Sequence, residues 1–149
     1  MPAGGPRGRQ LVTMSRGVVL FAHGARDPQW SRALHELARR VGDRAPELRV
    51  ATAFLEFQPP GLAEAVATLA QNCTDIDILP VFWAPAGHVA NELPRLVEVC
   101  QAAHPQLTLR VLPTLSELPG LLDFIAAQAA ALATADAARV TASRTARSR

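Results

Sequence analysis

Three side chains with metal-ligand chemistry each follow a short apolar run of the chain. His23 comes after "VVLFA", Glu56 ends "RVATAFLE", and His88 follows "IDILPVFWAPAG". Two imidazoles and a carboxylate suit Zn, Fe, Co or Ni, and sites with open coordination positions commonly use this set. Imidazole also accepts protons near neutral pH, so one histidine can be a ligand and a base at different moments. The residue types predict a site for a divalent transition metal.

Each of the three residues also has an ordinary structural interpretation when taken alone. His23 can satisfy loop carbonyls, whereas Glu56 and His88 both precede predicted helices, where Glu56 suits the helix dipole. The other two histidines do not follow an apolar run: His35 lies in the middle of a predicted helix and His104 at a helix end. A function is favoured because all three residues follow predicted strands, and the carboxyl ends of parallel strands lie at one edge of their sheet.

Further candidates surround the histidines. Arg26 and Asp27 are interpreted either as a solvated arginine with a helix cap or, for Arg26, as a grip on an anionic substrate. Gly24 and Gly87 allow tight turns and leave room for a bulky molecule near the backbone. Trp83 is expected in the core more than as a stacking surface for a flat ligand.

The elements that must position these residues alternate between β and α patterns. Short runs rich in β-branched residues are followed by segments of helical period, which predicts four βα units and a parallel sheet. We expect a single α/β domain, a doubly wound three-layer sandwich with a four-stranded parallel sheet. Ligands of such sheets collect outside the carboxyl ends of the strands. The predicted strands are residues 18–22, 49–56, 76–83 and 107–112.

Sequence signals also place the ends of the predicted helices. Asp27 is the expected N-cap of the first helix, with Pro28 at its first position. Pro94 is tolerable only in a first turn, which predicts that the third helix begins near Asn91. The "TLSE" stretch, residues 114–117, has capping-box spacing ahead of the fourth helix. The predicted buried faces carry Trp30, Leu34, Leu37 and Val41, then Leu62, Val66, Leu69 and Cys73, and finally Leu118, Leu121, Leu122 and Ile125.

The charge distribution argues against a nucleic-acid partner. The formal net charge is +2, but residues 14–133 hold nine arginines against twelve acidic residues, and the excess of arginine lies in the two ends. No basic groove with interleaved aromatics is visible in the central region. We expect a disordered extension over residues 1–13, the α/β domain over 14–133 and a disordered Arg-rich tail over 134–149.

Composition narrows the chemistry and the compartment further. All fifteen basic residues are arginine, which excludes a Walker-A lysine, a lysine Schiff base and a pyridoxal linkage. Cys73 and Cys100 are expected to be buried inert thiols, ahead of a disulfide or metal pair. No apolar run reaches the roughly 18 residues of a membrane span, and no secretory signal is visible. We therefore expect a cytoplasmic protein without a membrane partner.

Three stretches together resemble the sirohydrochlorin chelatase family, the small CbiX type of class II tetrapyrrole metal chelatases. They are "HGARDP", "AFLE" and "LPVFWAPAGHVANELP", in this order, and the resemblance covers most of residues 17–126. It implies a flavodoxin-like sheet, a homodimer, and ATP-independent insertion of cobalt, iron or nickel into a sirohydrochlorin-type ring. His23 and His88 match the two active-site histidines of the family, and Glu56 matches its acidic residue.

The resemblance has two departures and implies a mechanism. Glu92 stands where the family favours Asp, and Trp83 where an aliphatic residue is commoner, which bears on substrate fit. The metal would lose waters to the histidines and Glu56, and a free histidine would accept the pyrrole protons. Protonated imidazole does neither, so acid should inhibit. The metal is a substrate, and no permanently bound cofactor is expected.

Three alternative functions stay open on the sequence. A histidine phosphatase also has His-Gly after its first strand, but it needs an arginine where Ala22 stands. A metal carrier would bind Co or Ni through the same residues without accelerating insertion. A ligand-free interaction module would bind no metal. The physiological metal, and whether the product serves sirohaem, cobalamin or a nickel tetrapyrrole, are not determined by these residues.

Overall fold

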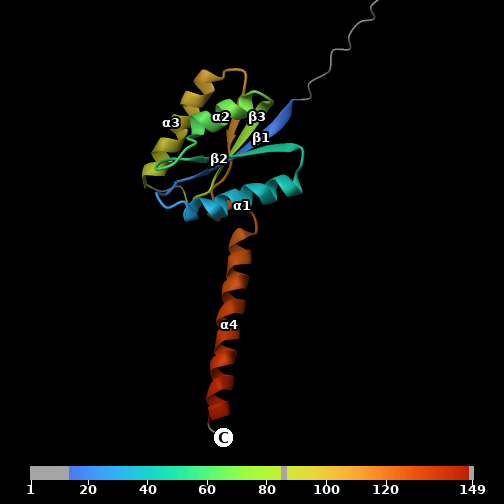
Figure 1. Cartoon of the computed structure of the whole chain (residues 1–149), viewed down its shortest axis with the longest axis vertical. Helices are drawn as coiled ribbons and strands as arrows, with labels where there is room; N and C mark the ends of the chain where they lie inside the picture. The colour runs from blue at the N-terminus through green and yellow to red at the C-terminus, as the bar shows by residue number, and fades with distance from the viewer. Residues whose placement is uncertain (1–13, 85–86, 148–149) are drawn as a thin grey trace, which may run out of the picture.

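The computed structural model describes residues 14–84 and 87–147, with side chains described up to residue 135. Its centre is a four-stranded parallel sheet in the order β2-β1-β3-β4 (Figure 1), as the sequence predicts. All neighbouring strands pair in parallel, which requires a crossover between each strand and the next. The strands are β1 (Ser15–Ala22), β2 (Leu48–Phe54), β3 (Cys73–Pro80) and β4 (Thr108–Val111).

Helices cover both faces of this sheet, so the predicted three-layer α/β fold is confirmed. The elements that follow the strands are α1 (Gln29–Arg44), α2 (Leu62–Ala70), α3 (Gly87–Ala103), the 3-10 turn η1 (Leu115–Glu117) and α4 (Leu121–Arg147). Figure 1 shows α2 and α3 on one side of the sheet and α1 on the other. These crossovers bring the chain back to the same edge of the sheet after every strand.

Alternate residues of β1 build the two halves of the core. Val18 and Leu20 pack with Leu34 of α1 on one face. Val19 and Phe21 point to the opposite face, which α2 and α3 cover. Because both faces of β1 are covered, its burial runs without interruption from Val18 to Phe21, which is typical of a central parallel strand.

The strand order creates a topological switch point between β1 and β3. The chain leaves β1 through α1 toward β2 on one side, and leaves β3 through α3 toward β4 on the other. Connections that diverge from two adjacent strands open a crevice at their carboxyl ends. His23 follows β1 and His88 follows β3, so both predicted histidines border this crevice.

Several predicted helix boundaries are wrong in detail. Pro94 lies well inside α3, because that helix begins at Gly87 and not near Asn91. A proline inside a helix removes one backbone hydrogen bond. The packing of α3 on α2 and β4 offsets this loss. The helix α1 begins one residue after the expected position, and the carboxylate of Asp27 accepts a 2.9 Å hydrogen bond from the Gln29 N–H.

Two other expectations fail because a local motif does not determine the length or the surroundings of its helix. The Thr114–Glu117 capping box forms as predicted, but it lies at the start of η1 and not at the start of the long helix α4. Trp30, expected in the buried face of α1, is 76% exposed, and it lines the cavity next to His23 instead of packing in the core.

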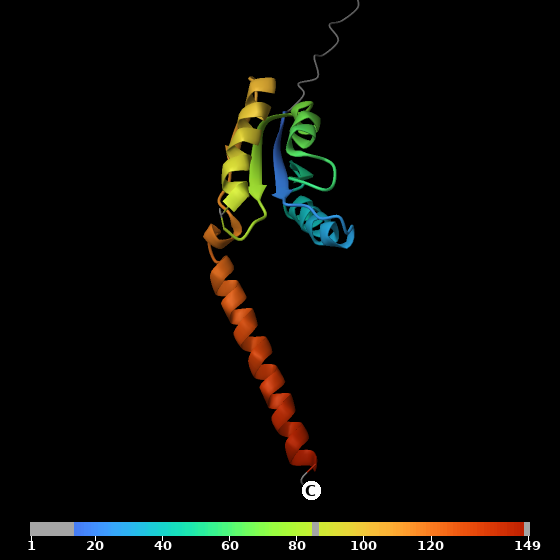
Figure 2. The ribbon, with the colours of Figure 1, turned by 90° about the vertical axis from the view of Figure 1, so that its left-hand side faces the viewer.

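The last helix departs most from expectation. Helix α4 projects away from the domain (Figures 1 and 2) and contacts mainly η1. Leu122 and Ile125, predicted to pack on the sheet, are therefore exposed, as are Phe124 and Leu132. Residues 134–147, predicted to be disordered, continue the helix. The alanine-rich sequence "AAQAAALATADAA" explains this, since alanine has the highest helix propensity.

The N-terminal expectation lies outside the described residues. The predicted extension over residues 1–13 is not described, and Met14 directly precedes β1. Over the described part of the chain, no helix has both the length and the apolar character needed to cross a membrane.

Both cysteines are buried in the core face that α2 and α3 cover. Cys100 belongs to α3, but Cys73 is the first residue of β3 and does not end a helix as predicted. The error arises because helix α2 ends at Ala70, and after a two-residue turn Cys73 already belongs to the next strand. Burial raises the pKa of both thiols above the ordinary value, which keeps them protonated at neutral pH.

The buried thiols predict slow reaction with a disulfide reagent. In native buffer, we expect Cys73 and Cys100 to react at least about 10³-fold more slowly than in denaturant, because modification requires opening of the core. After unfolding in denaturant, two thiols per chain should react with the reagent. Reaction of either thiol at the rate of a free cysteine would contradict its burial in the core.

Candidate active site

His23 and Glu56 are held together through their backbones. The Leu55 N–H donates to the Ala22 carbonyl, and the Glu56 N–H donates to the His23 carbonyl, each at 2.9 Å. These two bonds continue the pairing of β1 with β2 beyond the last paired residues of both strands. The sheet therefore delivers His23 and Glu56 side by side at its carboxyl edge.

The turn that follows His23 requires glycine. Gly24 has φ of +91°, a conformation that side chains disfavour, and a Cβ placed on it would overlap the carbonyl oxygen of Glu56. The absence of a side chain thus allows the two loops to approach closely. The predicted role of Gly24 in a tight turn agrees with this geometry.

Glu56 and His88 are brought together across the crevice. The Nε2 atom of His88 lies 3.7 Å from Oε1 of Glu56, with the two side chains 66% and 40% exposed. The separation is too long for a direct hydrogen bond. It is close to the spacing of about 3.4 Å expected for two ligands with bonds of about 2.1 Å to one tetrahedral ion. A small movement would let both side chains bind the same metal.

The third predicted ligand is near this pair but does not join it. The Nδ1 atom of His23 lies 3.3 Å from the Gly24 carbonyl oxygen. Within residues 14–84 and 87–147, no group of three His, Cys, Asp or Glu side chains is close enough to hold an ion. His23 is exposed, so rotation about its side-chain bonds is the motion that would change this distance.

Two residues after Glu56 escaped sequence reasoning. Phe57 has φ of +69° and lies close to both His23 and Arg26. The side-chain oxygen of Gln58 accepts a 3.1 Å hydrogen bond from the Ala25 N–H, which adds a side-chain link between the two loops to the backbone hydrogen bonds. The only signal in the sequence was the position of "FQ" directly after a candidate ligand, because neither residue type identifies a turn by itself.

The polar neighbours predicted from the sequence fall on different parts of the site. Arg26 is exposed and packs its Cζ 5.3 Å from the centre of the Phe57 ring, while Asp27 caps α1. Gly87 has φ of +62°, and within the described part of the chain no atom lies near the place where its Cβ would stand. The expectation that Trp83 is a core residue is wrong, since it is 55% exposed beyond the end of β3.

The two remaining histidines lie off the site, as expected. His35 is exposed in α1 and its ring meets Phe54 edge-on at 6.2 Å. His104 follows the last residue of α3, and its N–H donates to the Cys100 carbonyl. These two positions offer matched controls for substitutions of the site histidines.

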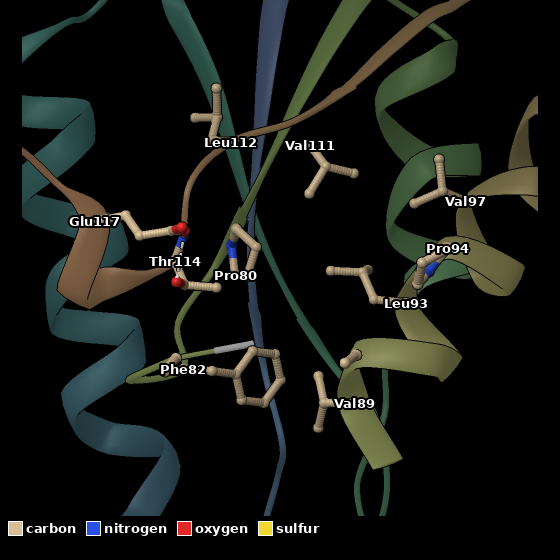
Figure 3. A pocket seen from close by; sticks show the side chains of 12 residues that line it. Pro80, Phe82, Val89, Leu93, Pro94, Val97, Val111, Leu112, Thr114 and Glu117 are labelled. Carbon is tan, nitrogen blue, oxygen red and sulfur yellow. Dashed lines mark hydrogen bonds between the residues drawn. The ribbon is translucent and has the colours of Figure 1, made fainter. Parts of the chain in front are cut away.

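An apolar cavity of about 450 Å³ opens beside the start of α3. Figure 3 shows that Val89, Leu93 and Val97 of α3 face Pro80 and Phe82 across it. Val111 and Leu112 also line it, as do the polar residues Thr114, which precedes η1, and Glu117, the last residue of η1. A second cavity of about 310 Å³ adjoins His23. His23 therefore lines the smaller cavity, and the apolar cavity begins at Val89, the residue after His88.

Comparison with known proteins identifies the family. The CbiX family model matches residues 17–132. A sirohydrochlorin cobaltochelatase of Priestia megaterium is 26% identical over 62% of this chain, and one of Methanocaldococcus jannaschii is 32% identical over 58%. The matched segments span 30% and 62% of those two relatives.

Solved structures agree with this match. A CbiX protein from Marinobacter aquaeolei VT8 aligns over 81% of this chain and 98% of its own length, with 25% identity and a TM-score of 0.67. SirB from Bacillus subtilis subspecies spizizenii, in complex with cobalt, aligns over 67% of this chain and 44% of its own, with 18% identity and a TM-score of 0.61, and shows likeness of fold alone. The resemblance drawn from the sequence motifs is confirmed, and the chain belongs to the CbiX family.

Proposed function

We propose that the protein inserts a divalent metal, Co²⁺, Fe²⁺ or Ni²⁺, into a sirohydrochlorin-type tetrapyrrole without ATP. The observation that carries this proposal is the approach of His88 to Glu56 at the switch point of the sheet, in a chain of the CbiX family. Relatives named sirohydrochlorin cobaltochelatase support the substrate class.

In the proposed reaction, this edge of the sheet performs two tasks. Glu56 and His88 replace waters of the hydrated ion, since carboxylate and neutral imidazole are ligands for such metals. His23 contributes a ligand or, when it is free of metal, takes up the two pyrrole N–H protons one after the other and passes the first to solvent water before it accepts the second. No bound cofactor is needed for this exchange, because metal and tetrapyrrole are both substrates.

The proposed tetrapyrrole site uses residues beside the histidines. Sirohydrochlorin-type rings are flat and rich in carboxylates, and the exposed guanidinium of Arg26 suits one of these groups. Gly87 leaves the backbone open beside His88, because no atom of the described residues lies within 4 Å of the position of its missing Cβ. Both residues contribute to substrate binding in this proposal.

The oligomeric state and compartment belong to the same proposal. We infer a homodimer, supported by the exposed apolar side chains of α4, which include Leu122, Phe124 and Leu132. Light scattering would give twice the mass of one chain, and a single-chain mass would contradict this. A cytoplasmic location, with neither nucleic acid nor membrane as a partner, stays a prediction from the sequence.

The test is anaerobic absorbance of sirohydrochlorin with Co²⁺, Fe²⁺ or Ni²⁺, with and without the protein. Insertion should run faster than the spontaneous reaction for at least one metal. Equal rates with all three metals, combined with tight metal binding, would instead support a carrier. Phosphatase turnover that His23→Ala abolishes would support the phosphatase alternative, and absence of metal binding would support an interaction module.

A further inference from the structure

Phe57 occupies a backbone conformation that aromatic residues rarely adopt. Its φ is +69°, and among the described residues it is the one non-glycine with positive φ. The Gln58 N–H donates to the Glu56 carbonyl at 2.9 Å, so Phe57 is the central residue of a three-residue turn. The form of this turn with positive φ is rare and strained. A glycine at position 57 would remove that strain.

Burial does not explain why a phenylalanine stands there. The Phe57 side chain is 54% exposed and belongs to neither cluster of the core. A large apolar side chain placed mainly in solvent gains little from the hydrophobic effect. The strained turn therefore holds an aromatic ring at the surface without a matching gain in packing.

The ring instead contacts two of the candidate site residues. The centre of the Phe57 ring lies 5.3 Å from Cζ of Arg26, within the range of a cation–π interaction. It lies 6.0 Å from the centre of the His23 imidazole, with the two rings inclined by 44°. Phe57 also follows Glu56 directly, so one residue connects three members of the site.

The Arg26 side chain has few other restraints. It is exposed, and the structure gives it neither an ion pair nor a side-chain hydrogen bond within the described residues. A long side chain in solvent samples many rotamers, and ordering it on binding costs affinity. Contact with the Phe57 ring reduces the number of conformations that Arg26 samples before a substrate arrives.

We propose that Phe57, whose ring also meets His23, is a positioning residue that holds the Arg26 guanidinium against its ring, where Arg26 binds a carboxylate of the anionic tetrapyrrole. This inference rests on the proposed function and adds to it how substrate and metal are aligned. The strained turn after Glu56 points the ring toward Arg26, so a substrate carboxylate held by Arg26 lies at a defined position relative to Glu56 and His23. Strain stored next to a ligand is typical of functional sites.

The test compares Phe57→Gly, Phe57→Tyr and wild type in steady-state metal insertion. Phe57→Gly should raise the KM for the tetrapyrrole about fivefold, leave the KM for the metal unchanged, and leave Tm unchanged or higher because the strain is relieved. Phe57→Tyr keeps the ring and should behave like wild type. Val99→Ala, an exposed residue of α3 about three helical turns from His88, is a control for lost apolar surface.

A double-mutant cycle with Arg26→Gln decides whether Phe57 acts through Arg26. The variant with both substitutions should have the same tetrapyrrole KM as Arg26→Gln alone. Multiplied effects would mean that Phe57 contacts the substrate itself and would overturn the positioning role. An unchanged KM in Phe57→Gly, or a loss of kcat and Tm with no change in KM, would also overturn it. If wild type does not accelerate insertion, the proposed function fails, and this inference fails with it.

Discussion

Replacement of His88 by alanine should reduce protein-dependent metal insertion by about 100-fold or more, to near the spontaneous rate. The Nε2 atom of His88 lies 3.7 Å from the Glu56 carboxylate, so its loss removes the imidazole that approaches that group. His23→Ala should cause a loss of similar size, because the site would lack its proposed proton acceptor. The measurement is the anaerobic absorbance change on insertion of Co²⁺, Fe²⁺ or Ni²⁺.

The two off-site histidines provide matched controls for this experiment. His35→Ala and His104→Ala also remove one imidazole each, but from α1 and from the end of α3. Both should keep the wild-type insertion rate. Circular dichroism should show that all four variants are folded, since both His23 and His88 are exposed. A folded His88→Ala variant with full activity would exclude His88 from the reaction.

Metal affinity should separate the roles of the three residues. Titration with Co²⁺ should show a loss of at least about tenfold in affinity for His88→Ala and Glu56→Gln, because the structure already brings these two side chains together. His23→Ala should lose less Co²⁺ affinity than these two variants, although its insertion rate falls by a similar factor, because the His23 ring lies outside the His88–Glu56 pair. Equal losses of affinity in all three variants would mean that His23 is a full ligand.

The largest effect on stability is expected for Gly24→Ala. A methyl group there would overlap the Glu56 carbonyl oxygen, and φ of +91° adds the cost of a conformation that alanine avoids. We expect a loss of about 3 kcal/mol or more in the free energy of unfolding, together with loss of insertion. The loss of activity follows because the overlap separates the loops that carry His23 and Glu56. Urea denaturation gives the stability and the absorbance assay the activity.

Two other glycines separate backbone strain from steric overlap. Gly120 has φ of +79° but no atom near its missing Cβ, so Gly120→Ala should cost only about 1 kcal/mol. Gly42 lies in α1 with no close neighbour and without positive φ, so Gly42→Ala should stabilise the protein by about 0.5 to 1 kcal/mol. If Gly24→Ala is no more destabilising than Gly120→Ala, the close approach of the two loops does not exist in solution.

Patterns of short range account for what could be predicted. The apolar runs before His23, Glu56 and His88 predicted parallel strands, since a strand buried on both faces is apolar throughout. Ligands at the ends of such strands must share one edge of the sheet, and the structure brings Glu56 and His88 to that edge. The motifs also predicted the family, because their order along the chain is specific even where each is short.

Packing over longer distances decided the rest. Helical period predicted that Leu122 and Ile125 face the sheet, but period cannot show whether a sheet lies beneath a helix. Helical period placed Trp30 on a buried face and the end of a buried strand placed Trp83 in the core, yet both side chains are exposed. Pro94 was expected in a first turn, and tertiary packing overrode the local preference.

The sequence by itself determined the α/β class, the four strands and the residue types available for metal chemistry. Apolar runs and helical period are local patterns, so a short stretch of residues is enough to indicate a strand or a helix. Only the tertiary structure decided the distances: the pairing of His88 with Glu56, the loop contact that Gly24 permits, and the strained turn that sets Phe57 beside Arg26. The physical reason is that these contacts join residues distant in the chain, and their geometry depends on backbone angles and strand order that no single stretch encodes.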